Sequence, residues 1–261
     1  MPELDFIIPN WPAPANVKAL QTTRIGGVSL APYASLNLGA HVNDDVNAVA
    51  KNRQILGHYL PSEPVWINQV HGTEVIDAAQ SQCLQNADAS FTTQPNIVCV
   101  TMTADCLPVL LCDKAGTVVA SVHAGWRGLC DGVIEAAVAK MPAQAADLMA
   151  WLGPAIGPQA FEVGSEVRAQ FIAKDVQAAL AFTPCEHHQL NDKWLGNIYQ
   201  IATQRLNRLG VTQIYGATDH GNASDHGEEG EFFCTYTDEA RFFSFRRDNV
   251  TGRMASLIWL D

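Results

Sequence analysis

Two apolar segments separated by a short turn constrain the fold more than any other feature of this sequence. The segment "LPVLLC" begins at residue 107, "TVVASVH" ends at residue 123, and a polar turn near Lys114–Gly116 separates them. Both segments are rich in residues that favour strands, and turn residues bound them, which predicts a β-hairpin. A hairpin returns its two ends to the same side, so we expect Cys106 and His123 to lie close together.

Other segments predict a mixed arrangement of strands and helices. Strand-like segments dominate the first half of the chain: "VKALQTT", "VWINQV", "EVIDA" and "IVCVTMT". Helical periodicity marks residues 44–60 with Asn43 or Asp44 as N-cap, 131–141 with Asp131 as N-cap, 165–173, and 196–210 ended by Gly210. The order of these elements predicts an α+β fold with mixed or antiparallel sheets and helices packed outside. In "FFSFRRD" we expect a strand on which Arg246 and Arg247 alternate between faces.

The composition argues against several classes of function. The chain carries 27 acidic and 16 basic residues, a net charge of −11, and no basic stripe offsets it. Nucleic acid and anionic membrane surfaces would repel such a chain, so neither is expected as a partner. No apolar stretch approaches the roughly 18 residues of a membrane span, and the N-terminus lacks the pattern of a secretory signal. We therefore expect a cytoplasmic protein whose 7 cysteines are thiols rather than disulfides.

Two histidines and a cysteine occupy similar places at the ends of strand-like segments. His71 lies in "NQVHGTEV" and His123 in "SVHAGWRG", each just before a glycine turn, and Cys106 follows Asp105 at another strand boundary. Loops at such ends commonly build functional sites. Two imidazoles and a thiolate suit a catalytic zinc ion, because three protein ligands leave a fourth position for water or substrate. Zinc would lower the pKa of such a water to about 7.

The same residues permit other interpretations. Cys106 and His123 could form a nucleophile–base dyad, with Asp105 orienting the base, and this needs only one histidine. A set of two histidines and a cysteine also occurs in blue copper sites. A multicopper oxidase needs many more histidines, usually in His-x-His pairs, and this sequence contains no such pair. On the residues alone, a catalytic metal, a dyad and three structural polar side chains remain open.

Arginines and amides near glycine turns indicate where an anionic substrate would bind. Arg24 precedes the double glycine of "TTRIGGVS", and Arg127 lies in the glycine turn that opens a helix. Backbone N–H groups together with arginine make a pocket suited to phosphate. Asn37 in "SLNLG" and Gln69, two residues before His71, are predicted to form hydrogen bonds with a substrate.

Several motifs in a fixed order make the sequence resemble a known family. They run from about Thr22 to Trp259: "TTRIGGVS", "SLNLG", "NQVHGTEV", "MTADCLPVLL", "VHAGWRG", "GPAIGPQAFEVG", "FFSFRRD" and "TGRMASLIW". Together they closely resemble the bacterial YfiH family, relatives of the human protein FAMIN, which has also been described as a family of multicopper polyphenol oxidases or laccases. The resemblance implies one domain over residues 1–261 with four α/β/β/α layers, similar to the deamidase domain of cytotoxic necrotizing factor.

The resemblance also implies a metal and an activity. It implies that His71, Cys106 and His123 bind zinc, with copper less favoured. It implies phosphorolysis of adenosine, inosine or methylthioadenosine and deamination of adenosine, so the partners would be a small nucleoside and phosphate. In the mechanism that we predict from it, Arg24 and Arg127 hold phosphate, and Asn37 and Gln69 bind sugar or base. Asp105 would move protons, alongside Cys106 and His123.

Two alternatives within the family stay open at this point. One is a hydrolase with Cys106 as nucleophile and His123 as base, acting on an amide such as a peptidoglycan precursor. The other is a laccase-like, copper-dependent polyphenol oxidase. The chain departs from its relatives at residues 219–231, an acidic stretch that we expect to be a mobile surface loop. The sequence leaves the oligomeric state open and is compatible with a monomer.

Overall fold

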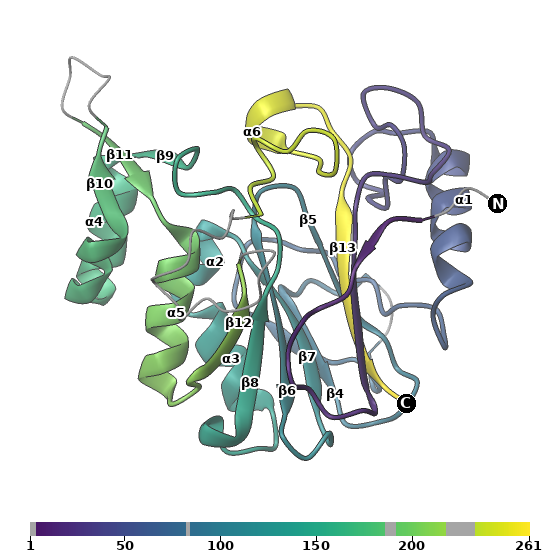
Figure 1. The fold of residues 1–261 in the computed structure, drawn as a ribbon, viewed down its shortest axis with the longest axis horizontal. Helices are drawn as coiled ribbons and strands as arrows, with labels where there is room; N and C mark the ends of the chain where they lie inside the picture. The colour runs from purple at the N-terminus through teal and green to yellow at the C-terminus, as the bar shows by residue number, and fades with distance from the viewer. Residues whose placement is uncertain (1–3, 82–83, 186–191, 218–232) are drawn as a thin grey trace.

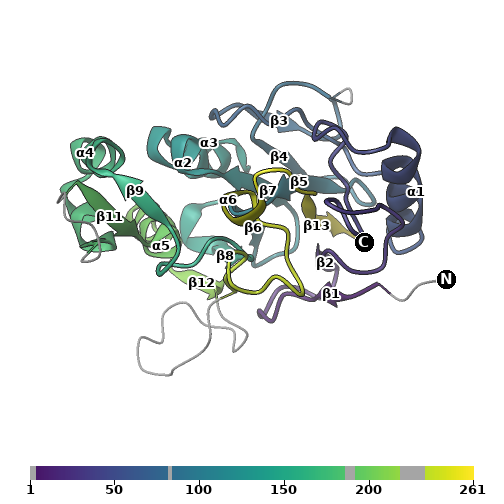
Figure 2. The ribbon, with the colours of Figure 1, turned by 90° about the horizontal axis from the view of Figure 1, so that it is seen from above.

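Two stacked β-sheets with helices on their outer faces make up the structure, a computed structural model that describes residues 4–81, 84–185, 192–217 and 233–261 (Figures 1 and 2). The predicted acidic loop at 219–231 lies outside these residues. The first sheet has the order β1 (Phe6–Ile7), β2 (Val17–Thr22), β13 (Met254–Leu260) and β5 (Cys99–Thr103). The second has the order β12 (Gln213–Gly216), β8 (Leu148–Leu152), β6 (Leu107–Asp113), β7 (Val119–Ala124), β4 (Ala89–Thr92) and β3 (Val75–Asp77).

Helices cover the outer face of each sheet, so the architecture has four layers. Helix α1 (Val46–Gly57) packs Ile55 and Leu56 on the first sheet. Helices α2 (Trp126–Asp131), α3 (Val133–Lys140) and α5 (Ile198–Leu209) pack on the second sheet. A small third sheet, β10 (Phe182–Pro184), β11 (Lys193–Gly196) and β9 (Glu162–Gly164), lies with α4 (Ser165–Lys174) beside α5. The predicted α+β class is confirmed.

The predicted hairpin is confirmed and lies at the centre of the second sheet. β6 and β7 pair antiparallel, with Leu107 opposite Ala124 and Pro108 opposite His123. Every residue of both strands is buried. These strands are largely apolar, with Asp113, Ser121 and His123 as exceptions, because the first sheet covers one of their faces and helices cover the other. The register brings the residue just before the hairpin, Cys106, to the same end of the sheet as His123.

Several predicted element boundaries were wrong. Helix α1 begins at Val46, two residues after the start of the expected range, since Asp45, not Asn43 or Asp44, accepts hydrogen bonds from the first N–H groups. Asp131 ends α2 and caps nothing, and α3 starts after Gly132, whose φ of 106° suits glycine alone. Residues 65–70, expected to be a strand, form only isolated bridges at Val65 and Asn68.

The segment "FFSFRRD" was predicted as a strand and is instead a short helix. Ser244 caps α6 (Phe245–Asp248) by accepting a hydrogen bond from the Arg247 N–H. The serine two residues before the arginine pair is an N-cap signal that outweighs the alternation of apolar and polar residues.

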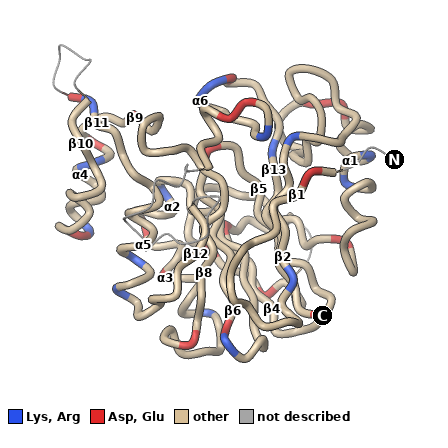
Figure 3. Tube along the Cα trace, in the orientation of Figure 1, with Lys and Arg blue, Asp and Glu red and all other residues tan. Residues whose placement is uncertain are grey.

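None of the described helices combines the length and apolar character that a membrane span requires. Lys and Arg lie interspersed with Asp and Glu along the described trace (Figure 3).

We expect Asp113→Ala to destabilise the hairpin without changing the site at its other end. The Asp113 carboxylate accepts hydrogen bonds from the Thr117 N–H at 2.7 Å, the Thr117 hydroxyl at 2.6 Å and the Val118 N–H at 3.1 Å. Burial opposes the charged form, but these bonds outweigh it and lower the pKa of Asp113. Removing them should reduce the free energy of unfolding by about 1–3 kcal/mol, measured by urea denaturation at pH 7.

The lowered pKa of Asp113 determines how the loss of stability in Asp113→Ala changes with pH. A lowered pKa in the folded state stabilises the protein above the pKa of the unfolded carboxyl, and this stabilisation disappears as the pH falls through the folded-state value. The difference between wild type and Asp113→Ala should therefore shrink below about pH 4. Asp147→Ala is the matched control, because that exposed carboxylate only approaches Lys114 at 4.0 Å. Equal losses in the two variants would contradict the prediction.

Candidate metal centre

Three side chains converge at the end of the second sheet where the hairpin opens. The ligand atoms of His71, Cys106 and His123 all lie within 4.8 Å of one another. The Cys106 Sγ is 3.7 Å from the His71 Nε2, and the two imidazole rings meet edge to face with centroids 4.8 Å apart. His123 is buried, Cys106 is half-buried and His71 is exposed, so the cluster has a protected side and an open side.

Asp88 organises both histidines, although no sequence pattern singles it out. Its carboxylate accepts a hydrogen bond from the His123 Nδ1 at 2.8 Å. It also accepts hydrogen bonds from the N–H groups of Val70 at 3.2 Å, His71 at 2.9 Å and Gly72 at 2.6 Å. Its carbonyl oxygen accepts the His123 N–H at 2.7 Å. One fully buried carboxylate therefore sets the turn that carries His71 and the orientation of the His123 ring.

The turn at His71 has an unusual backbone conformation. His71 has a φ of 61°, in the left-handed region that few side chains adopt. The three hydrogen bonds from residues 70–72 to Asp88 hold this turn in place. Such conformations persist where surrounding contacts determine them, and they gather at functional sites.

Gly125 leaves room for the cluster. A Cβ at this position would lie 2.8 Å from the His71 Cδ2 and 3.1 Å from the Cys106 Sγ. Gly128 is similarly restricted, because its Cβ would lie 2.6 Å from the carbonyl oxygen of Gly72. The glycine turn of "HAGWRG" is thus required for the close approach of two chain segments rather than for an unusual φ.

The three side chains fit a zinc ion. Zinc–sulfur and zinc–nitrogen bonds of about 2.3 and 2.05 Å at a tetrahedral angle place sulfur and nitrogen about 3.6 Å apart, close to the observed 3.7 Å between Cys106 and His71. Because the His123 Nδ1 bonds to Asp88, its Nε2 is left for a metal, and the carboxylate would raise the basicity of the ring. The cluster supplies three protein ligands, which is the arrangement of catalytic rather than structural zinc sites.

The charges of Cys106 and His123 support each other. Burial disfavours the thiolate, but the charge and hydrogen bond of His123 outweigh burial and lower the pKa of Cys106 to about 6. Burial likewise opposes the imidazolium, but the charge of Cys106 and the hydrogen bond to Asp88 raise the pKa of His123 to about 9. Near neutral pH the metal-free pair is therefore thiolate and imidazolium. A metal ligand must be a neutral imidazole, so metal binding would release the proton of His123.

A pocket of about 260 Å³ opens beside the cluster. Its volume lies just below the usual range for small-molecule sites, which begins at roughly 300 Å³. His71, Asp105 and Cys106 lie on one wall, and two arginines, Arg127 and Arg246, line it as well. The remaining lining is apolar or aromatic: Ala104, Trp126, Ile156, Phe161, Ile198 and Phe245. The pocket can therefore accept a small molecule with an anionic group and a flat or apolar part.

Three of the predicted substrate residues are used elsewhere. Arg24 donates to the carbonyl oxygens of Ala34 at 2.9 Å and Glu239 at 3.0 Å, and does not line the pocket. The Gln69 amide exchanges two hydrogen bonds of 2.7 Å with the backbone of Met102. Both side chains hold backbone segments together in this structure, and their contact with substrate stays a prediction.

Asn37 also differs from the prediction. It is fully buried, and its Oδ1 accepts hydrogen bonds from the N–H groups of Gly39 and Arg253, each at 2.9 Å. Asn37 therefore holds the backbone of Arg253, in the "TGRMASLIW" motif. Burial lowers the pKa of Arg253, and the nearby charges of Cys106 and Asp105 offset this effect only in part. The Arg253 side chain is half-buried.

Residues of α6 were only partly recognised from the sequence. Phe242 and Phe243 are fully buried, but Phe245 is 51% exposed and lines the pocket. Of the two adjacent arginines, Arg246 lines the pocket, whereas Arg247 donates to the carbonyl oxygens of Thr235 at 2.8 Å and Phe242 at 3.1 Å. One arginine of the pair therefore lines the pocket. The two side chains differ in direction because they are neighbours on a helix, not because they alternate along a strand.

Comparison with known proteins shows the family to which the chain belongs. Residues 18–261 match the model of a family described as multi-copper polyphenol oxidoreductase laccase. The chain is 52% identical to the purine nucleoside phosphorylase YfiH of Shigella flexneri, over 98% of each chain. It is 52% identical to a purine nucleoside phosphorylase of Haemophilus influenzae, over 99% of this chain and 100% of that protein.

A solved structure agrees with these sequence matches. The crystal structure of a Neisseria meningitidis protein superposes with a TM-score of 0.88 at 46% sequence identity, covering 98% of this chain and 99% of that one. The likeness therefore extends over nearly the whole fold.

Proposed function

This chain belongs to the YfiH family, and we propose that it is a zinc-dependent purine nucleoside phosphorylase that also deaminates adenosine. The observation that carries the proposal is the three-ligand cluster opening into a small pocket that two arginines line. Zinc held by His71, Cys106 and His123 would supply a Lewis acid next to the substrate. Relatives about half identical to this chain carry the name purine nucleoside phosphorylase.

The pocket supplies what phosphorolysis needs besides the metal. In that reaction a phosphate oxygen bonds to the ribose C1′, and the bond from C1′ to the purine nitrogen breaks, so that the base leaves with the electron pair. Arg127 and Arg246 would hold the phosphate by charge-assisted hydrogen bonds. The Trp126 and Phe245 side chains offer apolar surface against which a purine can pack. Both arginines hold the anion near the cluster, so phosphate and nucleoside would meet there.

Deamination would use the same pocket with water in place of phosphate. Water adds its oxygen at C6 of adenosine and ammonia leaves, giving inosine. A site with three protein ligands and room for one more group suits such an addition. We therefore expect inosine and then hypoxanthine to form from adenosine when phosphate is present.

A Cys106–His123 hydrolase is the second candidate, favoured by the thiolate–imidazolium pair. A lowered thiol pKa beside a protonated histidine is the usual preparation of a cysteine nucleophile. This function has no need of His71, whose turn is nevertheless held by three hydrogen bonds to Asp88. The copper oxidase suggested by the family description needs several metal clusters. Among the residues that the structure describes, one cluster of three such ligands is found.

Phosphate-dependent turnover tests the proposed function. The purified protein should contain about one zinc ion per chain, by elemental analysis, given three converging ligands. It should release hypoxanthine from inosine, with ribose 1-phosphate, only when phosphate is present, as followed by liquid chromatography. In the same assay Arg127→Ala and Arg246→Ala should raise the KM for phosphate about tenfold or more, because each removes a charge-assisted bond.

Arg208→Ala provides the matched control, since that arginine pairs with Asp175 on the far side of α5. It should leave the KM for phosphate unchanged. A zinc-containing protein that releases no base from inosine or adenosine would refute the nucleoside proposal. Amide hydrolysis that survives removal of the metal would support the second candidate instead.

A further inference from the structure

Asp105, the residue before Cys106, joins three separate segments of the chain. Its carboxylate accepts hydrogen bonds from the Thr235 hydroxyl at 2.7 Å on one oxygen and from the Arg246 N–H at 2.6 Å on the other. Its carbonyl oxygen accepts the Ile156 N–H at 3.0 Å. The side chain is buried, and φ is 85°, a conformation that a residue other than glycine keeps only where its contacts require it.

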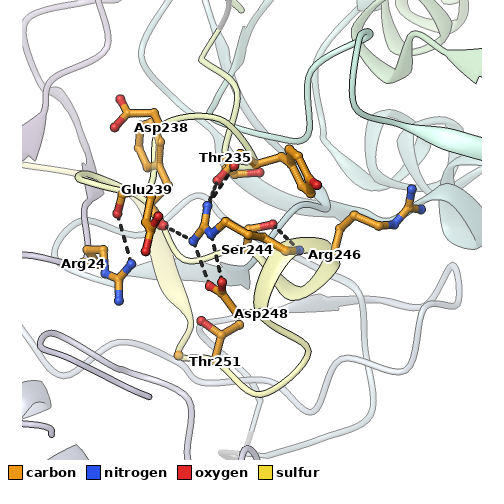
Figure 4. Close-up of polar contacts among 12 residues, drawn as sticks. Arg24, Thr235, Asp238, Glu239, Ser244, Arg246, Asp248 and Thr251 are labelled. Atoms are coloured by element: carbon orange, nitrogen blue, oxygen red, sulfur yellow. Dashed lines mark hydrogen bonds and ion pairs between the residues drawn. The ribbon is translucent and has the colours of Figure 1, made fainter. Parts of the chain in front are cut away.

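These contacts connect the residue before Cys106 to other residues that line the pocket. Ile156 and Arg246 both line the pocket, and Cys106 follows Asp105 directly. The Arg246 N–H lies in the first turn of α6, so the Asp105 carboxylate acts as a second cap on this helix beside Ser244. Figure 4 shows the Arg246 side chain pointing away from the group formed by Thr235, Ser244 and Asp248. The backbone of Arg246 is thus held from one side, while its guanidinium donates to the carbonyl oxygens of Glu162 at 2.8 Å and Ala160 at 3.5 Å and lines the pocket.

Thr235 belongs to the structure behind the pocket and not to its lining. It is fully buried, its N–H donates to the carbonyl oxygen of Ala155 at 3.0 Å, and its own carbonyl oxygen accepts from Arg247 at 2.8 Å. Arg247 also pairs with Asp248 at 2.8 Å, within the same helix. The hydroxyl of Thr235 therefore ties α6 and the segment before it to Asp105, without facing a substrate.

We propose that Asp105 is a positioning residue, which fixes α6, and with it Phe245 and Arg246, relative to Cys106. This role differs from the proton transfer predicted from the sequence, because each carboxylate oxygen already accepts a hydrogen bond from the chain. The changes in KM that we expect for inosine and phosphate rest on the proposed function. The geometric content of the inference, that the Thr235–Asp105–Arg246 contacts hold α6 at a fixed place relative to Cys106, does not depend on which substrate is used.

Thr235→Val tests the inference without replacing a metal ligand or a residue that lines the pocket. Valine keeps the shape of threonine and removes the hydroxyl, leaving one Asp105 oxygen without its partner. We expect the KM for inosine and phosphate to rise about tenfold, with a smaller change in kcat. Zinc content and the pH profile of kcat should stay as in the wild type. Thr235→Ser should restore the wild-type KM, because it keeps the hydroxyl.

A second measurement does not require nucleoside turnover. In the metal-free protein, Cys106 should react with iodoacetamide several times faster in Thr235→Val than in the wild type, as mapped by mass spectrometry of its peptide. Thr237→Val, two residues along and exposed at the surface, is the matched control and should match the wild type in both measurements.

The outcomes separate this inference from the proposed function. Wild-type KM values or an unchanged alkylation rate in a folded Thr235→Val protein would overturn the positioning role. If Asp105→Asn lowered kcat at unchanged KM and removed one limb of the pH profile, Asp105 would move protons, which also overturns it. If the wild type turned over no nucleoside, the proposed function would fail. Faster alkylation in Thr235→Val that Thr235→Ser reverses would still support the positioning role.

Discussion

His71→Ala should abolish zinc binding and lower phosphorolysis of inosine by more than about a hundredfold. Loss of a residue that merely orients a metal ligand typically costs ten- to a hundredfold in affinity or activity, so loss of a ligand should cost more. His71 is one of three converging ligands, and its Nε2 lies 3.7 Å from the Cys106 Sγ. Zinc content after dialysis and turnover in the presence of phosphate measure the two effects.

This variant also separates the two candidate functions. His71→Ala leaves the Cys106–His123 pair and its bond to Asp88 in place, so a cysteine hydrolase should keep much of its amide hydrolysis. His71→Asn is a second variant, because asparagine tolerates the φ of 61° better than alanine does. His58→Ala, which changes an exposed histidine at the end of α1, should bind zinc as the wild type does. Retained zinc in both His71 variants would contradict the metal site.

Asp88→Ala should weaken zinc binding by about a hundredfold or more. The substitution removes the partner of the His123 Nδ1 and of three backbone N–H groups at the His71 turn, so both histidines lose their orientation. Outer-shell carboxylates of this kind typically account for ten- to a hundredfold in metal affinity, and this one serves two ligands. Competition with a chromophoric chelator measures the affinity. The absorption of the cobalt-substituted protein reports the geometry of the thiolate site.

The control for Asp88 is a carboxylate with a similar task elsewhere. Asp113 is also buried and also accepts hydrogen bonds from backbone N–H groups, but it lies at the far end of the hairpin. Asp113→Ala should lower stability while zinc affinity stays unchanged. If Asp88→Ala lost stability yet bound zinc like the wild type, the carboxylate would be a structural residue and not an organiser of the metal centre.

The elements of the fold that could be predicted from the sequence are those with a strong, long pattern. The hairpin of β6 and β7 and helices α4 and α5 follow from continuous apolar runs or from helical periodicity bounded by turn residues and caps. Short segments were ambiguous. Residues 65–70 alternate like a strand yet use the Gln69 side chain, rather than a ladder, to bond the backbone of Met102.

The convergence of His71, Cys106 and His123 could be predicted because these side chains follow strand-like segments at equivalent positions, and the resemblance adds to this signal. The direction of a polar side chain could not be predicted. Arg24, Asn37 and Gln69 lie near glycine turns, as substrate residues often do, but their hydrogen bonds hold the chain together. Asp88 was missed because it lies in an ordinary stretch of small residues, "NADAS", and only the fold brings it to both histidines.

The contributions to the site are divided along the chain. The three side chains of the cluster and Asp88 all come from residues 71–123, a stretch that includes strands of both sheets, and the glycine turn follows directly. Much of the apolar wall and one of the arginines come from later segments, through Ile156, Phe161, Ile198, Phe245 and Arg246. Evolution could therefore alter which molecule is recognised by changing the later segments while leaving the reactive centre intact. A family with this division of labour can diversify its substrates on one inherited chemistry.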